Sequence, residues 1–282
     1  MTFSTLPEIH KKAGTYLPDL MESDPVVFNG VLCTVTSVRA GSSGTEIIIH
    51  NLFTKQELAR KAFAYGLVCA LVDNGVLYVF GSSNWGSPGN HVAMISTTDL
   101  MNWTNPVTVF NTHISGQTIL NTSVDKTPTG YVMAYEVTEP GTTAFSIRTA
   151  TSTDLLSWTP IGVVVHPTSY AACPCIKYMN GWYYIVYLRN VDGGFVSFIM
   201  RTNDFVTYDY FNGNAKWPSS TQFLSHASFP TEGNNNSDVG MVEHNGIVYI
   251  TYAVGDQQTW GNIRTAVYLG TLEQLFKEFW PN

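Results

Sequence analysis

The stretch that decides the fold is residues 237–269, SDVGMVEHNGIVYITYAVGDQQTWGNIRTAVYL. It opens with a mostly apolar run at 239–244, and the pair Asn245-Gly246 that follows favours a type I′ hairpin turn. Residues 247–254 are rich in β-branched and aromatic side chains, and a third such run covers 262–268. The stretch therefore predicts three consecutive antiparallel strands separated by polar turns.

The same pattern recurs along the chain. A strand, a turn and a second strand are predicted near residues 24–38, 67–81, 121–137 and 173–188. A second marker of the form Ser/Thr-x-Asp-Leu/Phe-x-x-Trp/Tyr, which we call the Ser-x-Asp-Leu-x-x-Trp phrase after its copy at Asp154, follows three of the hairpins around Asp99, Asp154 and Asp204. The spacing of these aspartates is longer than a hairpin needs and suits a four-stranded blade, whereas a β-sandwich would not predict the repetition. Because the three aspartates recur with the repeat, we assign them to turn capping.

We therefore predict an all-β chain that forms a five-bladed β-propeller with a short C-terminal helix. The helix should cover residues 272–279, because Thr271 and Gln274 form a capping box. Residues 1–20 are expected to be an irregular lead-in, and the polar segment 54–61 suits a helical turn capped by Thr54. The whole chain, 1–282, is predicted to be a single domain with blades at about 21–60, 64–112, 117–167, 170–213 and 237–282.

The composition limits the classes of partner that the protein can have. Apolar residues make up 44% of the chain and charged residues 12%, with a net charge of −7 and no cluster of Lys or Arg, which argues against disorder and against a nucleic-acid partner. Neither a membrane-spanning run nor a signal peptide is visible, so we expect a cytoplasmic protein or one exported without a local signal, for example on a phage particle. The oligomeric state stays open.

Cysteine and histidine usage predicts no cofactor. The four cysteines, Cys33, Cys69, Cys173 and Cys175, are expected to be free thiols packed in the interior, and the seven histidines show no metal-ligand spacing. A structural calcium ion in the central channel stays open at this point.

Blade geometry predicts where a site lies. The first strand of each blade lines the central channel, and the second strand returns antiparallel, so its end meets the start of the first strand on one face. First-strand starts contribute Asp24, Asn121 and Asp238, and His226 lies in the long polar connection 214–236. The residues at or just after second-strand ends are Arg39, Asn84, Trp85, Glu136, Glu139, Arg189, Asp256, Gln257 and Trp260.

Facing carboxylates with aromatic and amide side chains between them are typical of sugar chemistry, in which one acid protonates the leaving oxygen and another carboxylate activates water or attacks the ring. Glu136 sits within an apolar strand, where an unpaired carboxylate is costly, which favours a site or a buried ion pair over a solvent-facing position. Asp24 and Asp238 also suit turn ends, and Arg39 and Arg189 also suit structural pairing with carboxylates.

Several of these motifs resemble the five-bladed propeller glycoside hydrolases, the superfamily of arabinanases, arabinofuranosidases, β-xylosidases, invertases and anhydrogalactosidases. The resemblance rests on the repeated strand-turn-strand, Asp24-Pro25, the Ser-x-Asp-Leu-x-x-Trp phrases and Ser237-Asp238, and it covers nearly the whole chain. In the arabinanase and xylosidase group a first-blade Asp is the general base, which implies that role for Asp24. That group also has an Asp in blade three that tunes the general acid, and a Glu in blade four that is the general acid. At these two places this chain has Asn121 and Cys173-Pro174-Cys175.

We therefore expect a glycosidase that cleaves a furanose or anhydro sugar linkage of an oligosaccharide or polysaccharide with inversion. Asp24 is the expected base, Glu136 the expected acid, and Asp238 an orienting residue or second acid. The residues expected to bind the substrate are Arg39, Asn84, Trp85, Asn121, Arg189, His226, Asp256, Gln257 and Trp260. One alternative is a propeller that binds carbohydrate without catalysis. A second, less favoured, is a lyase on uronic acid polymers, which would use Arg39 and Arg189 but lacks a Tyr/His or Lys pair placed for proton abstraction.

Overall fold

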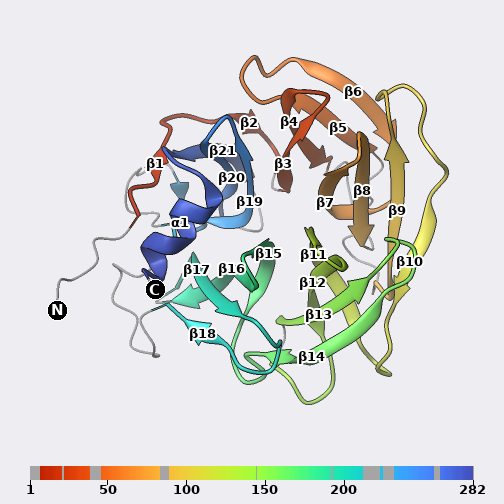
Figure 1. Cartoon of the computed structure of the whole chain (residues 1–282), viewed down its shortest axis with the longest axis vertical. Helices are drawn as coiled ribbons and strands as arrows, with labels where there is room; N and C mark the ends of the chain where they lie inside the picture. The colour runs from red at the N-terminus through yellow and green to blue at the C-terminus, as the bar shows by residue number, and fades with distance from the viewer. Residues whose placement is uncertain are drawn as a thin grey trace.

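The structure is a computed structural model that describes residues 7–20, 22–38, 46–82, 89–143, 145–191, 193–211, 223–224, 232–256 and 261–281. Five antiparallel sheets stand around a central axis as the blades of a propeller (Figure 1). The predicted all-β, five-bladed fold with a short C-terminal helix is confirmed.

Four blades consist of four consecutive strands each, and the first strand of each lies nearest the axis (Figure 1). Blade 1 contains β3 (Ser23–Phe28), β4 (Val31–Ser37), β5 (Glu46–Asn51) and β6 (Glu57–Ala62). Blade 2 contains β7 (Gly66–Asp73), β8 (Val76–Ser82), β9 (His91–Thr97) and β10 (Val107–Asn111). Blade 3 contains β11 (Thr118–Thr127), β12 (Gly130–Thr138), β13 (Ser146–Ser152) and β14 (Thr159–Val165), and blade 4 contains β15 (Ala172–Met179), β16 (Trp182–Val191), β17 (Gly194–Thr202) and β18 (Asp209–Tyr210).

Blade 5 combines both ends of the chain. Its inner strands are β19 (Ser237–His244), β20 (Ile247–Gly255) and β21 (Gly261–Tyr268), and the N-terminal strands β1 (His10–Lys11) and β2 (Leu17–Pro18) pair with β21. The expectation that residues 1–20 form an irregular lead-in was therefore wrong for His10–Lys11 and Leu17–Pro18. Without these strands β21 would expose a row of unpaired backbone groups at a sheet edge, and the N-terminal segment satisfies them.

The turns follow the predicted chemistry. Asn245 and Gly246 have φ of 53° and 73°, as a type I′ turn requires, and Asn29, Asn74 and Asn180 adopt the same left-handed conformation in front of their glycines. Helix α1 (Leu272–Phe279) starts with the predicted capping box at Thr271. The predicted helical turn at 54–61 was wrong, because residues 57–62 form the outer strand β6, whose charged side chains suit an exposed edge.

The Ser-x-Asp-Leu-x-x-Trp phrase closes the turn between the third and fourth strands of a blade. Asp154 Oδ1 accepts hydrogen bonds from the backbone N–H groups of Leu156 and Ser157 at 2.8 and 2.9 Å, and Trp158 Nε1 donates to the carbonyl of Leu155 at 3.1 Å. Asp99 and Asp204 make the same backbone contacts in their blades. The assignment of these aspartates to turn capping is confirmed.

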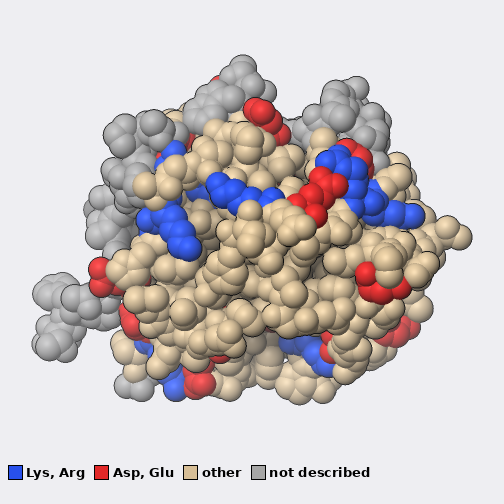
Figure 2. All heavy atoms as spheres, turned by 90° about the horizontal axis from the view of Figure 1, so that it is seen from above, with Lys and Arg blue, Asp and Glu red and all other residues tan. Residues whose placement is uncertain are grey.

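Apolar clusters fill the space between neighbouring blades, and α1 packs Leu275, Phe276 and Phe279 into the cluster shared by blades 4 and 5. All four cysteines are free, as predicted, and three of them are buried; the predicted interior position was wrong for Cys173, which is only partly buried. The edge-on view in Figure 2 shows positive and negative side chains interspersed over a mostly uncharged surface. The helix that the structure describes is too short to cross a bilayer.

Candidate functional site

The inner strands begin with a repeated irregularity. The pairing register shifts near the starts of β7, β11, β15 and β19. In three of them a non-glycine residue sits in the left-handed region there, namely Leu67, Cys173 and Asp238, with φ of 53°, 47° and 49°. A β-bulge redirects a side chain, and left-handed non-glycine residues concentrate at functional sites because the backbone is strained there. The bulges therefore mark the end of the propeller at which the first strands begin.

A pocket opens at that end of the axis, and all five inner strands or the residues just before them contribute to it. The empty space in and directly above it, open solvent included, amounts to about 340 Å³. The structure places the predicted residues Asp24, Asn121 and Asp238 together in its wall. The other lining residues are Glu22, Ser23, Val68, Cys69, Thr122, Ser123, Cys173, Pro174, Val239 and Gly240.

Asp24 is held firmly at the boundary of three blades. It is 8% exposed, and its Oδ2 accepts a hydrogen bond from the backbone N–H of Ala70 in blade 2 at 2.9 Å. On the other side Gly240 of β19 approaches so closely that a Cβ at this position would lie 2.8 Å from Oδ1. Burial raises the pKa of Asp24 above its ordinary value, while the Lys177 ammonium and the Ala70 hydrogen bond act in the opposite direction.

Glu136 lies on β12, behind the pocket wall. It is 2% exposed, and its Oε2 accepts hydrogen bonds from the backbone N–H of Cys173 at 2.8 Å and from Asn121 Nδ2 at 3.0 Å. Burial raises the pKa of Glu136 to about 7, and the charge of Asp238 adds to this shift, against the effect of the two hydrogen bonds. A carboxyl group that titrates near neutral pH is suited to general acid catalysis.

Asp238 and Cys173 face each other across the start of blades 4 and 5. Asp238 is half-buried and accepts a short hydrogen bond from Ser237 Oγ. Burial, together with Asp238 and Glu136, raises the pKa of the Cys173 thiol well above its ordinary value. The thiol therefore stays protonated at neutral pH, which excludes a thiolate nucleophile at this position.

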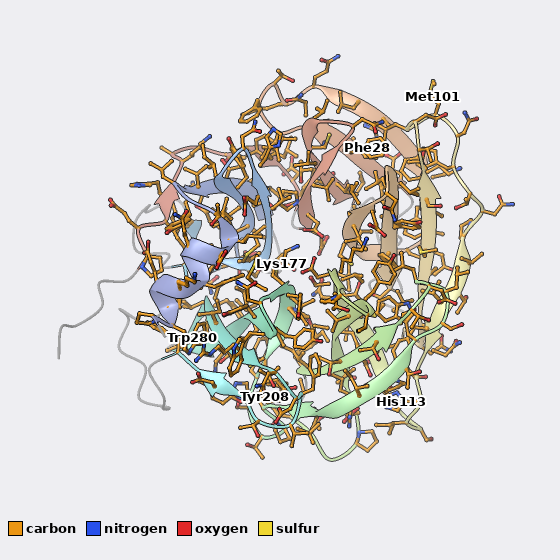
Figure 3. All side chains as sticks on the ribbon, in the orientation of Figure 1. Phe28, Met101, His113, Lys177, Tyr208 and Trp280 are labelled. Atoms are coloured by element: carbon orange, nitrogen blue, oxygen red, sulfur yellow. The ribbon has the colours of Figure 1, made fainter. Side chains whose placement is uncertain are left out.

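Two charged residues near the axis were not predicted from the sequence. Glu22 lines the pocket at 3% exposure and accepts a hydrogen bond from Ser37 Oγ at 3.2 Å. Lys177 lies near the centre of the ring (Figure 3); burial lowers its pKa, but nearby acidic groups, Asp125 first, outweigh burial and hold the pKa above its ordinary value. The sequence held one signal for these two residues, because side chains two positions apart in a strand lie on the same face. Glu22 precedes Asp24 by two residues, and Lys177 follows Cys175 by two.

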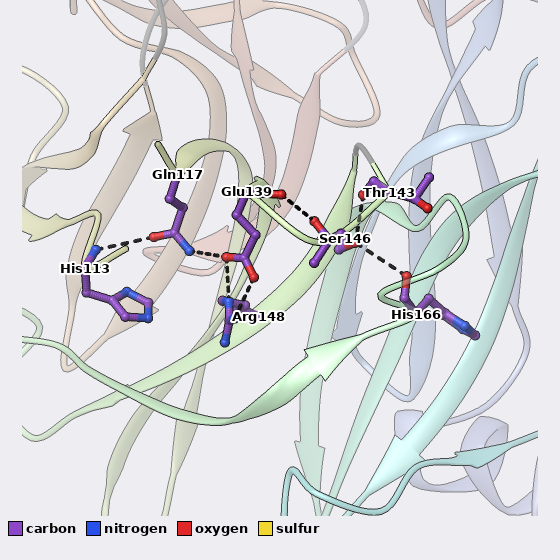
Figure 4. A network of polar contacts seen from close by, with 8 residues as sticks. His113, Gln117, Glu139, Thr143, Ser146, Arg148 and His166 are labelled. Atoms are coloured by element: carbon purple, nitrogen blue, oxygen red, sulfur yellow. Dashed lines mark hydrogen bonds and ion pairs between the residues drawn. The ribbon is translucent and has the colours of Figure 1, made fainter. Parts of the chain in front are cut away.

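Glu139 is tied into a separate network beside blade 3 (Figure 4). Arg148 binds both of its carboxylate oxygens, at 2.8 and 2.5 Å, and Gln117 Nε2 donates to it at 2.6 Å. Burial raises the pKa of Glu139, but these hydrogen bonds outweigh burial, so the pKa lies below its ordinary value. Glu139 is therefore ionised at neutral pH and serves to hold this part of the blade together.

The remaining predicted residues do not extend the pocket. Arg189, which the lyase alternative needs, does not line it and lies beside His166, Tyr187 and Tyr210. Asp256 follows β20, is partly exposed and does not line the pocket either. The other predicted substrate-binding residues lie outside the described residues: Arg39, Asn84, Trp85, His226, Gln257 and Trp260.

Among the residues that the structure describes, no three His, Cys, Asp or Glu side chains gather as metal ligands would. That the protein uses no cofactor stays a prediction.

Neither a protein-family model nor a curated protein sequence matches this chain. The likeness to solved structures is clear. The α-L-arabinofuranosidase of Podospora anserina, solved with cellotriose, has a TM-score of 0.66 at 8% identity, with 94% of each chain covered. The α-L-arabinofuranosidase of Lactobacillus brevis has a TM-score of 0.66 at 12% identity, covering 90% of this chain and 91% of that chain.

An endo-arabinanase of glycoside hydrolase family 43 from Bacillus licheniformis has a TM-score of 0.63 at 11% identity, covering 91% of this chain and 95% of that chain. A second family-43 protein, from a Bacteroides ovatus xyloglucan locus, has a TM-score of 0.62 at 13% identity, and the chain spans only about half of it, 54%, while 92% of this chain is covered. At such low identities the likeness concerns the fold, so the chain shares the five-bladed propeller of glycoside hydrolase families 43 and 62.

Proposed function

We propose that the protein is a glycoside hydrolase that acts on an oligosaccharide or polysaccharide in the pocket at the propeller axis. One observation carries the proposal: Asp24 and Asp238 line a single pocket with Asn121, and the buried Glu136, whose pKa is about 7, is hydrogen-bonded to two residues of the pocket wall. Two carboxyl groups at the same cavity, one to protonate the leaving oxygen and one to activate water, are what inverting glycoside hydrolysis needs.

In the proposed mechanism Asp24 is the general base. Burial raises the pKa of Asp24, while the Ala70 N–H and the Lys177 ammonium act in the opposite direction and stabilise its ionised form. In that form its carboxylate can take a proton from a water molecule that attacks the anomeric carbon. Attack by water from the face opposite the leaving group inverts the anomeric configuration. The absence of a side chain at Gly240 leaves the space that the Asp24 carboxylate occupies, because a Cβ there would lie 2.8 Å from Oδ1.

Glu136 is the proposed general acid. It carries a proton up to about pH 7 and gives it to the glycosidic oxygen as the bond breaks. Because it is 2% exposed, it can reach that oxygen only at the wall formed by Asn121 and Cys173. Asp238 supports the proton on Glu136, since a nearby negative charge disfavours the ionised acid.

The substrate is proposed to contain a furanose or anhydro sugar. The similar structures are named as enzymes acting on arabinose- or xylose-containing glycans, so arabino- and xylo-oligosaccharides are the first compounds to examine. Purified protein should be screened against aryl glycosides and against plant, algal and bacterial polysaccharides. A proton NMR time course on any substrate found should show the product first in the opposite anomeric form, and retention would exclude direct attack by water.

A second candidate is a propeller that binds carbohydrate without hydrolysing it. Asn121 and Cys173 favour it, because they stand where the resembled enzymes have carboxyl groups of the catalytic set. The two candidates differ in one measurement. A protein that binds oligosaccharides in calorimetry and hydrolyses nothing in the panel would be a binding propeller.

A further inference from the structure

Three aromatic side chains meet where blades 3 and 4 adjoin. Phe145 directly precedes β13, Tyr170 lies two residues before β15, and Phe195 is the second residue of β17. The Tyr170 ring centroid lies 5.3 Å from that of Phe145 and 5.9 Å from that of Phe195. All three belong to the starts of first or third strands, which lie at the pocket end of an antiparallel blade. We call these three residues the aromatic cluster.

The aromatic cluster lies next to the pocket wall, although none of its three members lines the pocket itself. Tyr170 comes three residues before Cys173 in the pocket wall, and its pKa is raised by burial and then by the charges of Cys173, Glu136 and Asp238. The backbone N–H of Phe195 donates to the carbonyl of Asn234 at 2.6 Å, and that of Asn236 donates to the carbonyl of Phe195 at 3.0 Å. Phe195 thus lies alongside the segment that leads into Asp238.

The cluster differs from the aromatic residues of the core. Tyr187 and Phe198, between the same two blades, are both 0% exposed, whereas each member of the cluster is partly exposed. Phe145 is also held in the left-handed region, with φ of 64°, and its carbonyl accepts a hydrogen bond from Ala171 N–H at 2.7 Å. A bulky residue adopts this conformation only when its surroundings impose it. The backbone therefore presents the Phe145 ring at the surface at a conformational cost.

We propose that Phe145, Tyr170 and Phe195 form a subsite that stacks against a sugar ring on the leaving-group side of the scissile bond. The inference rests on the proposed function. The general acid must lie next to the leaving oxygen. Glu136, the proposed acid, belongs to blade 3, which adjoins the aromatic cluster, whereas the proposed base Asp24 belongs to blade 1. The cluster is therefore on the leaving-group side of the pocket. The occupant is a sugar ring, because its apolar C–H face packs on aromatic rings. The sugar is neutral and not acidic, because the adjoining pocket holds the carboxyl groups of Glu22, Asp24 and Asp238, which would repel a negative charge.

Substitution of the rings tests this subsite. Tyr170→Leu and Phe195→Leu keep apolar bulk but remove the aromatic face, and Tyr170→Phe keeps the face but removes the hydroxyl. Phe53→Leu is a matched control, because Phe53 is 58% exposed in the turn between β5 and β6, at the end of the blade opposite the pocket. Affinity would be measured by calorimetry with arabino- and xylo-oligosaccharides of one to five units, and melting curves would verify folding.

We expect the two Leu variants to bind the longer oligosaccharides about tenfold more weakly and the single sugar unchanged, and Tyr170→Phe and Phe53→Leu to bind like the wild type. Hydrolysis of a glycosyl fluoride, which has no ring on the leaving-group side, should be equal in all variants. If wild type binds oligosaccharides and both Leu variants bind them equally well, the subsite is overturned while the proposed function stands. If wild type neither binds nor hydrolyses any of these compounds, the proposed function fails and the subsite fails with it.

Discussion

Glu136 Oε2 and the backbone N–H of Cys173 form a 2.8 Å hydrogen bond that crosses from blade 3 to blade 4. The bond joins the proposed acid to a bulged residue whose side chain lines the pocket. The ionisation of Glu136 is thereby linked to the packing of two blades, and this link can be measured without any substrate.

Stability should depend on pH through Glu136. Its folded pKa of about 7 lies above the ordinary value of 4.5, so its contribution to stability is fully present below pH 4.5 and is lost as pH rises through 7. The free energy of unfolding of wild type should therefore fall by about 3 kcal/mol relative to Glu136→Gln between these limits, at 1.36 kcal/mol for each pKa unit. Urea denaturation of both proteins at pH 4.5, 6 and 8 measures the difference. Parallel stability profiles would show that Glu136 titrates normally.

Gly240 should be irreplaceable next to Asp24. A Cβ at this position would lie 2.5 Å from Pro25 Cδ and 2.8 Å from Asp24 Oδ1, so Gly240→Ala must displace the proposed base. We expect a loss of about 1–3 kcal/mol in stability, together with reduced turnover. Gly66→Ala is the matched control, because Gly66 starts the inner strand of blade 2 and an added Cβ there meets nothing within 4 Å. Equal activity of the two variants would contradict the placement of Asp24.

The repeated turn should contribute to stability alone. Asp154→Ala removes the acceptor of two backbone N–H groups in a turn at the end of the propeller opposite the pocket. The variant should melt at a lower temperature and keep wild-type kcat and KM. Differential scanning calorimetry and steady-state kinetics on the same preparation check both statements, and a change in kcat would connect the turn to the site.

Most of the fold could be predicted because its signals are local and repeated. Asn-Gly pairs, the Ser-x-Asp-Leu-x-x-Trp turns and the capping box at Thr271 each act over a few residues, and each formed as expected. The N-terminal strands β1 and β2 could not be found in this way, because two residues show no alternation and their partner β21 lies at the other end of the chain. The charged strand β6 was missed for a different reason: it faces solvent and therefore lacks an apolar pattern.

The site was only partly predictable. First-strand starts such as Asp24 and Asp238 reached the pocket because the inner strand is nearest the axis. Second strands lie further out, so Arg189 and Asp256 do not line the pocket and Glu136 lies behind its wall. Long-range contacts, such as Gly240 against Asp24, leave no trace in local sequence.

The pH dependence of activity should report the proposed acid. Because Glu136 must carry its proton to act, kcat/KM should decline as pH rises above about 7. The sign follows from the raised pKa: an ordinary glutamate would already be ionised near pH 5 and would give a profile that falls much earlier. A pH profile of wild type measures this limb directly. A rate that stays constant between pH 6 and 9 would exclude Glu136 as the acid.

The most direct measurement compares Asp24→Asn with Glu136→Gln on two aryl glycosides of the preferred sugar, one whose phenol leaves without protonation and one whose phenol needs it. Both variants should keep the fold and the affinity and lose turnover by about 10² to 10⁴-fold on the demanding substrate. The activated substrate should partly restore Glu136→Gln and leave Asp24→Asn slow, because water still lacks its base. Wild-type rates in both variants would contradict the assignment and direct attention to Glu22 and Asp238, the other carboxylates of the pocket.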